Sequence, residues 1–145
     1  MDSQGLERPV RHEALNLART LLCETSLCQK EDWKLGSAIY RNLILTSPNK
    51  LSTYSLFDDI NSRALADFKF TSADMDFFIS QCWNYGVYFS RMQSFNDAEK
   101  FLSLSLRILR FSPVLQSTFS DDLEGSYSVI LKLMKNTDTL GGMEE

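Results

Sequence analysis

The sequence predicts an all-α protein of about six antiparallel helices, which form the end of a tetratricopeptide-like helical repeat. Apolar residues recur at three- and four-residue steps in six successive segments, and this is the period of an amphipathic helix. No Asn-Gly or Asp-Gly dipeptide offers a hairpin turn, and alternation at period two is never sustained. A Trp-x-x-Gly spacing occurs twice, at Trp33–Gly36 and at Trp83–Gly86. The copies are 50 residues apart, not the about 34 of a strict array, which indicates a degenerate repeat.

The chain is long enough for one domain with a real core. Of its 145 residues, 43% are hydrophobic and 23% are charged, which is typical of a globular protein. We predict a helical-repeat module over residues 1–136, as the C-terminal part of a longer scaffold. The segment 137–145 follows the last helical pattern and contains two adjacent glycines, so we expect it to be a disordered tail.

The first three helices are predicted over residues 9–25, 31–46 and 53–67. Pro9 suits a first helical turn, where its missing N–H would have no partner in any case. Pro48 ends the second helix, because the residue before a proline avoids the helical conformation. The predicted buried faces consist of Val10, Ala14, Leu17, Leu21 and Leu22, then Trp33, Gly36, Ile39, Tyr40, Leu43 and Ile44, then Leu56, Phe57, Ile60, Ala64, Leu65 and Phe68.

The last three helices are predicted over residues 73–92, 94–111 and 120–136. Thr71 and Ser94 each stand three residues before an aspartate, which is the pattern of a helix start capped by a hydroxyl group. The predicted buried faces consist of Met75, Phe78, Ile79, Cys82, Trp83, Gly86 and Phe89, then Ala98, Phe101, Leu102, Leu104, Leu106 and Leu109, then Leu123, Tyr127, Ile130, Leu131 and Met134.

Gly86 and Ala98 are predicted to be structural residues. A glycine in a helix interior costs about 1 kcal/mol relative to alanine, so its presence at position 86 indicates that another helix comes close. Ala98 is the small residue that we expect opposite it, where the two helices form a tight hairpin.

The charge and the cysteines limit the function classes. The net charge is −4, and no run of Lys and Arg is dense enough to form a nucleic-acid-binding face, so we expect no direct nucleic-acid partner. No segment has the apolar length of a membrane span, and the N-terminus does not resemble a signal peptide. Cys23, Cys28 and Cys82 lack a CxxC pair, and His12 is the single histidine. We therefore expect reduced, mostly buried thiols and no metal or other cofactor.

The sequence contains none of the motifs that mark common enzyme sites. There is no GxGxxG, Walker A, GxSxG or HExxH motif. We interpret His12 as solvated or capping. The adjacent carboxylates Asp58-Asp59 are interpreted as solvated, and Asp121-Asp122 as an acidic first turn of the sixth helix. We therefore predict that the protein is not an enzyme.

Trp83 and Asn84 are the candidate binding residues, and two interpretations of Trp83 are left open. Trp83 lies on the apolar stripe of the fourth helix and is either core or an anchor for a partner. Asn84 is a poor residue in mid-helix, because its side chain competes for backbone hydrogen bonds, which favours a role in holding a bound segment. Tyr85, Tyr88 and Arg91 are the nearest residues expected to flank the pair.

The surrounding motif resembles a known family. Its residues are Cys82-Trp83-Asn84-Tyr85-Gly86-Val87, Ser90-Arg91, Ala98-Glu99-Lys100 and Leu104-x-Leu106-Arg107-x-Leu109. They resemble the C-terminal end of the meiotic Zip-four/Spo-twenty-two family, most clearly over residues 71–109. The resemblance implies a tetratricopeptide-like scaffold in the nucleus, on meiotic chromosomes, that links crossover proteins to the synaptonemal complex. It also implies that Trp83 and Asn84 dock a small helical protein of the central element.

Two other functions stay open at this point. One is a generic tetratricopeptide adaptor for an acidic or C-terminal peptide, which would need Arg91, Lys100 and Arg107 on one concave face. The other is a purely structural role, in which the segment caps the end of the solenoid and promotes self-association.

Overall fold

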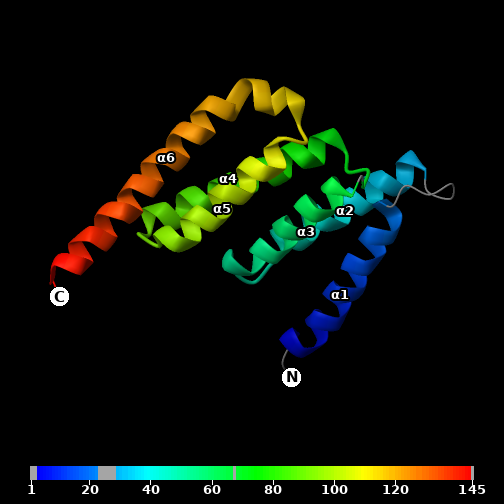
Figure 1. Ribbon diagram of the computed structural model, residues 1–145. Coiled ribbons are helices and arrows are strands. Elements are labelled where there is room, and N and C mark those ends of the chain that lie inside the picture. The colour runs from blue at the N-terminus through cyan, green and yellow to red at the C-terminus, as the bar shows by residue number, and fades with distance from the viewer. Residues whose placement is uncertain (1–2, 23–28, 67, 145) are drawn as a thin grey trace. The chain divides into compact units, whose positions relative to one another are not determined.

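The computed structural model describes residues 3–22, 29–66 and 68–144, with side chains described over 10–22, 29–66, 68–118 and 120–136 (Figure 1). Every regular element in these ranges is helical, which confirms the all-α prediction. The elements are α1 (Ser3–Leu22), α2 (Lys30–Leu45), the 3-10 helix η1 (Leu51–Thr53), α3 (Tyr54–Leu65), α4 (Ser72–Arg91), α5 (Phe95–Leu109) and α6 (Pro113–Glu144). The chain forms two compact units, Met1–Phe77 and Phe78–Glu145, and the division lies within α4.

In the first unit α1 and α2 pack antiparallel, and they come close together at Gly36. A Cβ on Gly36 would lie 2.7 Å from Cγ of Leu22, at the end of α1, and 3.0 Å from the carbonyl oxygen of Ala18. At the other end of the pair, the Arg11 guanidinium donates a hydrogen bond to the carbonyl oxygen of Leu43. The glycine of the first Trp-x-x-Gly copy therefore makes room for a neighbouring helix.

The predicted buried face of α1 is partly wrong. Val10 and Leu17 are 64% and 52% exposed, and Ala18, which was not predicted, is fully buried; Leu22 is fully buried as predicted. Both buried residues contact α2 beside Gly36, where the two helices are close together. A small side chain fits there, as Ala18 does, and so does one at the end of the helix, as Leu22 does. Periodicity alone selected the larger apolar residues, which lie on another side of the helix. Leu65 and Leu131, also predicted to be buried, are 67% and 41% exposed.

Asp59 is not solvated, contrary to the sequence prediction. It accepts hydrogen bonds from Arg19 on α1 (2.9 and 3.2 Å), from the hydroxyl of Tyr40 on α2 and from Arg63 one turn along α3 (3.3 Å). Its side chain is only 13% exposed. A carboxylate that is removed from water needs such partners, so this cluster ties the three helices of the unit together. Its neighbour Asp58 is exposed as predicted.

In the second unit α4 and α5 form the predicted hairpin. The hydroxyl of Ser94 donates to the Asp97 carboxylate (2.7 Å) where α5 begins. Thr71 pairs in the same way with Asp74 where α4 begins. A Cβ on Gly86 would lie 2.5 Å from both Cγ and Cδ2 of Leu102, so the nearest neighbour of the glycine is Leu102. Ala98, the predicted neighbour, is fully buried one turn earlier on α5.

The core of this hairpin is aromatic and aliphatic, with two polar groups satisfied inside it. Phe89 and Phe101 stack with ring centroids 5.3 Å apart. The thiol of Cys82 donates a hydrogen bond to the carbonyl oxygen of Phe101 (3.2 Å). The hydroxyl of Ser105 donates one to the carbonyl oxygen of Ile79 (3.2 Å). Burial raises the pKa of the Cys82 thiol, so it stays protonated and inert. The predictions for Cys23 and Cys28 lie outside the described residues.

The sixth helix begins seven residues before its predicted start, at Pro113. Proline at a first helical position has no N–H to satisfy, and the carbonyl oxygen of Ser112 accepts the first helical bond from Gln116 (2.9 Å). Asp121-Asp122 therefore lies in the helix interior, and the interpretation as an acidic first turn is wrong. The helix also continues to Glu144, through the segment predicted to be a disordered tail.

The turn between α4 and α5 contains a residue in the left-handed region. Gln93 has a φ of 61°, which costs a residue with a Cβ about 1 kcal/mol relative to glycine. We expect Gln93→Gly to raise the free energy of unfolding by about 0.5–1 kcal/mol, because the folded turn loses this strain. Urea denaturation checks the prediction, and a lower midpoint for the variant would contradict it.

Candidate functional site

Trp83 and Asn84 both line a cavity in the second unit, which we call the Trp83–Asn84 cavity. Its volume is about 300 Å³, at the small end of the range of ligand pockets. It is formed by the middle of α4, the end of α5 and the first half of α6. The lining residues are Ile79, Ser80, Trp83, Asn84, Leu109, Leu115, Asp122, Leu123 and Ser126.

The cavity has an apolar floor and a polar rim. Ile79, Leu109 and Leu123 are buried (2%, 3% and 8% exposed) and close its base, with Trp83 and Leu115 half-buried at its sides. The exposed side chains at its edge are polar, namely Ser80, Asn84, Asp122 and Ser126. A dry apolar centre surrounded by hydrogen-bonding groups is the usual anatomy of a protein–protein hot spot.

Asn84 has the hydrogen-bonding capacity that a binding residue needs. Its side chain is exposed and makes no hydrogen bond to another described residue. An amide offers two donors and an acceptor, so Asn84 can bind both the N–H and the C=O of an incoming backbone. The other distinctive rim group is Asp122, because it is the charged residue among those that line the cavity.

The four predicted binding residues other than Trp83 lie on two different sides of α4. Asn84, Tyr88 and Arg91 are all exposed, and their spacing of four and seven residues places them on one face of α4. Tyr85 lies on another side, where its ring meets the edge of Phe101 at 6.2 Å between centroids and burial raises the pKa of its hydroxyl. Tyr85 is therefore placed to support the hairpin, and Tyr88 and Arg91 extend the Asn84 face.

Trp83 lies between the two alternatives that the sequence left open. Its side chain is half-buried and forms part of the cavity wall. Its position on α4, next to the buried Cys82, places it at the edge of the core. One face of the indole can therefore pack on the protein while the other remains available to a ligand, as is common for tryptophan at interfaces.

Sequence reasoning missed the part of the cavity that α6 supplies. Leu115, Asp122, Leu123 and Ser126 come from the segment whose start was placed too late. The available signal was Pro113, which ends one helix and, as a preferred first helical residue, also begins the next. Leu123 was predicted as core, and it is buried at the base of the cavity.

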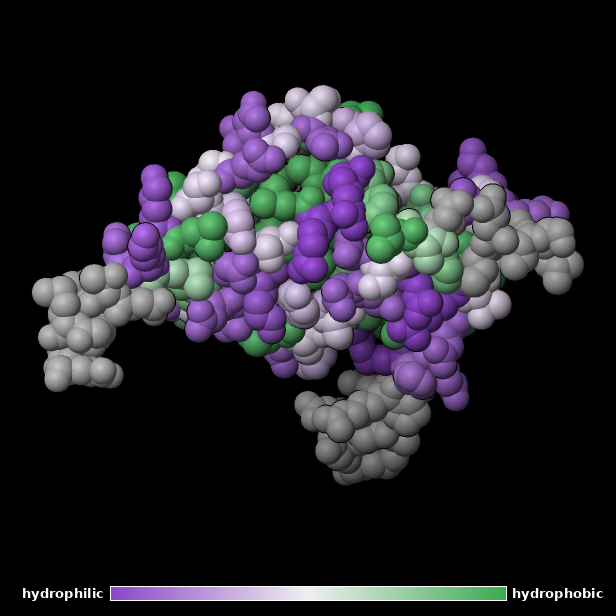
Figure 2. Space-filling model, in the orientation of Figure 1, coloured by the Kyte–Doolittle hydropathy of each residue, from purple (hydrophilic) through white to green (hydrophobic). Residues whose placement is uncertain are grey.

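Over the part of the chain that the structure describes, no three His, Cys, Asp or Glu side chains lie close enough to hold a metal ion. Within the same ranges, no helix combines the length and hydropathy of a membrane span. Figure 2 shows apolar patches interrupted by polar and charged side chains over the visible face.

Comparisons with protein-family models, with curated proteins and with solved structures find no match to this chain. The resemblance to the meiotic family accordingly stays an expectation from the residues over 71–109. The function must be argued from the geometry of the Trp83–Asn84 cavity.

Proposed function

We propose that the protein is an interaction module that binds a helical segment of a partner at the Trp83–Asn84 cavity. The observation that carries the proposal is that both predicted residues line one cavity with an apolar floor and a polar rim. A volume of about 300 Å³ is enough for one large apolar side chain of a partner. A partner helix would insert this anchor while its exposed edge meets the rim.

The polarity of the rim defines the partner further. Asp122 favours a lysine or arginine beside the apolar anchor, because a carboxylate at the edge of an interface selects the opposite charge. Asn84 would bind a polar group of the partner next to the same anchor. The family resemblance supports a small helical protein of the synaptonemal complex central element as this partner. In that case the module would act in the nucleus, on meiotic chromosomes, and link crossover proteins to the complex.

We expect Asn84→Ala to weaken partner binding about five- to thirtyfold. Loss of a hydrogen-bonded polar contact costs about 1–2 kcal/mol, and each 1.4 kcal/mol corresponds to a tenfold change in affinity. The variant should fold normally, since the side chain is exposed and alanine is the better helix former. The measurement is calorimetric titration of the full chain with purified central-element helical proteins.

Asn96→Ala is the matched control for this titration. It removes the same exposed amide from α5 at a position that does not line the cavity, so its affinity should stay within twofold of wild type. An Asn84→Ala protein that melts like wild type and binds equally well would sink the proposal. Trp83→Ala is less informative, because it also removes part of the core edge.

The acidic-peptide adaptor has less support. Arg91, Lys100 and Arg107 are exposed, but none of them lines the Trp83–Asn84 cavity, whose charged residue is an aspartate. An acidic ligand would meet repulsion there. The self-association alternative makes a separate prediction, because the mass measured by light scattering would then change with Trp83 substitutions in the absence of any partner.

A further inference from the structure

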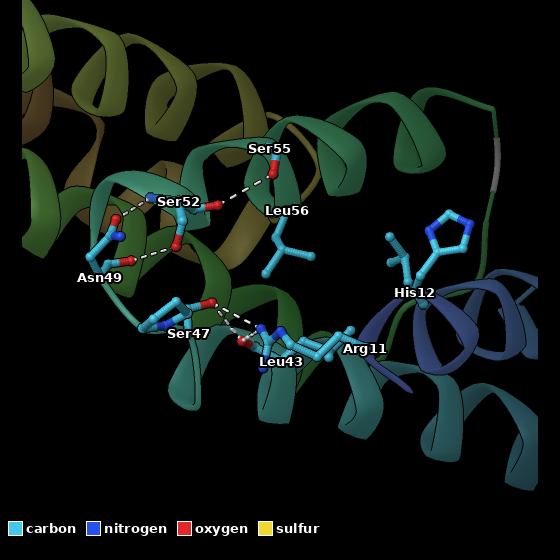
Figure 3. A pocket seen from close by; sticks show the side chains of 10 residues that line it. Arg11, His12, Leu43, Ser47, Asn49, Ser52, Ser55 and Leu56 are labelled. Carbon is cyan, nitrogen blue, oxygen red and sulfur yellow. Dashed lines mark hydrogen bonds between the residues drawn. The ribbon is translucent and has the colours of Figure 1, made fainter. Parts of the chain in front are cut away.

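A second pocket, in the first unit, has a chemical character opposite to that of the Trp83–Asn84 cavity. Its volume is about 480 Å³, and it opens between α1, the end of α2 and the start of α3 (Figure 3). We call it the Arg11 pocket. Its lining residues are Arg11, His12, Leu15, Leu43, Ser47, Pro48, Asn49, Ser52, Ser55 and Leu56.

The Arg11 pocket is rich in hydrogen-bond donors and has no acidic lining residue. Arg11 and His12 are its ionisable residues, in a protein whose net charge is −4. Figure 3 shows the Arg11 side chain reaching from α1 to Ser47, with Ser52 and Ser55 on the opposite side of an open space. The imidazole of His12 points away from the guanidinium. No carboxylate of the described residues lies within ion-pair distance of Arg11. The pocket is therefore a local positive site on an acidic protein.

The guanidinium of Arg11 is held in place but keeps donors to spare. It donates to the Thr46 hydroxyl (2.8 Å), to the Ser47 hydroxyl (3.0 Å) and to the Leu43 carbonyl oxygen. These bonds use three of the five N–H groups of an arginine. A fixed cation with unused N–H groups is preorganised for an oxyanion, because little conformational entropy remains to be lost on binding.

The serine opposite Arg11 can complete such a site. Ser55 Oγ makes one long hydrogen bond, 3.3 Å, to the carbonyl oxygen of Ser52. Because the residue is exposed, its hydroxyl can turn toward a ligand at little cost. Together with the two remaining N–H groups of Arg11, this hydroxyl gives the pocket three donors for a ligand. A phosphoryl group, with three acceptor oxygens and a charge of up to −2, uses such a set more fully than a carboxylate does.

We propose that the Arg11 pocket binds a phosphorylated side chain of a partner peptide. The proposal is independent of the Trp83–Asn84 cavity, with which the pocket shares no residue. It gives the module a second recognition site, one that responds to phosphorylation of the partner. Leu43, Leu56 and Leu15 form apolar walls on which the residue next to the phosphate can pack.

An NMR titration of the full chain tests the proposal. The probes are three otherwise identical pentapeptides whose central residue is phosphoserine, glutamate or serine. We expect saturable shifts of the Ser47, Ser52 and Ser55 amides with phosphoserine, at least tenfold weaker binding of the glutamate peptide and none of the serine peptide. Absence of a saturable shift with phosphoserine would overturn the site, and equal affinity for glutamate would overturn the preference for phosphate.

A pair of serine substitutions locates the site without disturbing Arg11, which also holds α1 to the end of α2. Ser55→Asp places a carboxylate in the pocket while suiting the first turn of α3, so the protein should fold and bind phosphoserine at least tenfold more weakly. Ser72→Asp adds the same charge to the first turn of α4, outside the pocket, and should change the affinity less than twofold. Equal loss in both variants would show that the pocket is not the site.

Discussion

Replacing Asp59 by alanine is expected to lower the free energy of unfolding by about 2–3 kcal/mol, one of the two largest effects we predict. The substitution leaves the Tyr40 hydroxyl and the Arg19 guanidinium without the acceptor that joins α1, α2 and α3. Fully buried pairs cost more when broken, but Arg19 is 29% exposed, so water recovers part of its solvation. Urea denaturation followed by circular dichroism measures the change.

Asp58→Ala is the matched control, since it removes the adjacent but exposed carboxylate. Its effect should stay within about 0.5 kcal/mol, as for an ordinary surface substitution. Equal destabilisation by the two variants would show that the Asp59 cluster does not hold the unit together.

The same cluster predicts a dependence of stability on pH. Burial by itself would raise the pKa of Asp59, but hydrogen bonds from Arg19 and Tyr40 and the Arg19 charge outweigh it and hold the pKa below its usual value. A depressed carboxyl pKa contributes stability that is complete above the unfolded-state value of about 4 and is lost as the pH falls through the folded-state value. Wild type should therefore lose more stability between about pH 5 and pH 3 than Asp59→Asn does. If wild type and Asp59→Asn lost the same amount of stability over this pH range, the lowered pKa of Asp59 would be contradicted.

Replacing Gly86 by alanine is expected to destabilise the protein by about 1–2 kcal/mol, although alanine favours helix. The added Cβ would lie 2.5 Å from Cγ and Cδ2 of Leu102 and 3.2 Å from its backbone nitrogen. Leu102 is fully buried and its Cγ cannot move away without displacing neighbours, so overpacking costs about 2–3 kcal/mol. The propensity gain of about 1 kcal/mol offsets only part of this cost.

Gly125→Ala is the control that separates the helix propensity of alanine from the packing cost of its Cβ. It makes the same change in the interior of α6, where a Cβ would meet nothing within 4 Å. This variant should be more stable than wild type by up to about 1 kcal/mol. The two alanine variants are thus expected to differ by about 2–3 kcal/mol in denaturation experiments. A stabilised Gly86→Ala protein would mean that α4 and α5 are not in close contact at this position.

The helices and the hairpin were predictable because their signals are local. Hydroxyl–aspartate pairs mark the starts of α4 and α5, and a glycine in each Trp-x-x-Gly copy marks a close helix contact. The face of α1 and the role of Asp59 were not predictable in this way. Both depend on which helix packs opposite. The sequence does not distinguish Asp58 from Asp59, because only the folded chain brings Arg19 and Tyr40 beside Asp59.

The candidate site was predictable only on its α4 side. An asparagine in mid-helix beside a tryptophan is a local anomaly, and it selected two residues of the Trp83–Asn84 cavity. The α6 side joins them through tertiary contact, and the Arg11 pocket combines segments more than 30 residues apart. No periodicity in the sequence relates such groups.

Hydrogen exchange of the full chain, measured with and without a small helical central-element protein, tests the central claim most directly. Binding at the Trp83–Asn84 cavity predicts slower exchange of backbone amides over residues 79–84 and 115–126, with 43–56 unchanged. With the partner at a subsaturating concentration, the protection should be much smaller for Asn84→Ala and unchanged for Asn96→Ala. A bound complex in which 79–84 and 115–126 exchange at unchanged rates would contradict the account.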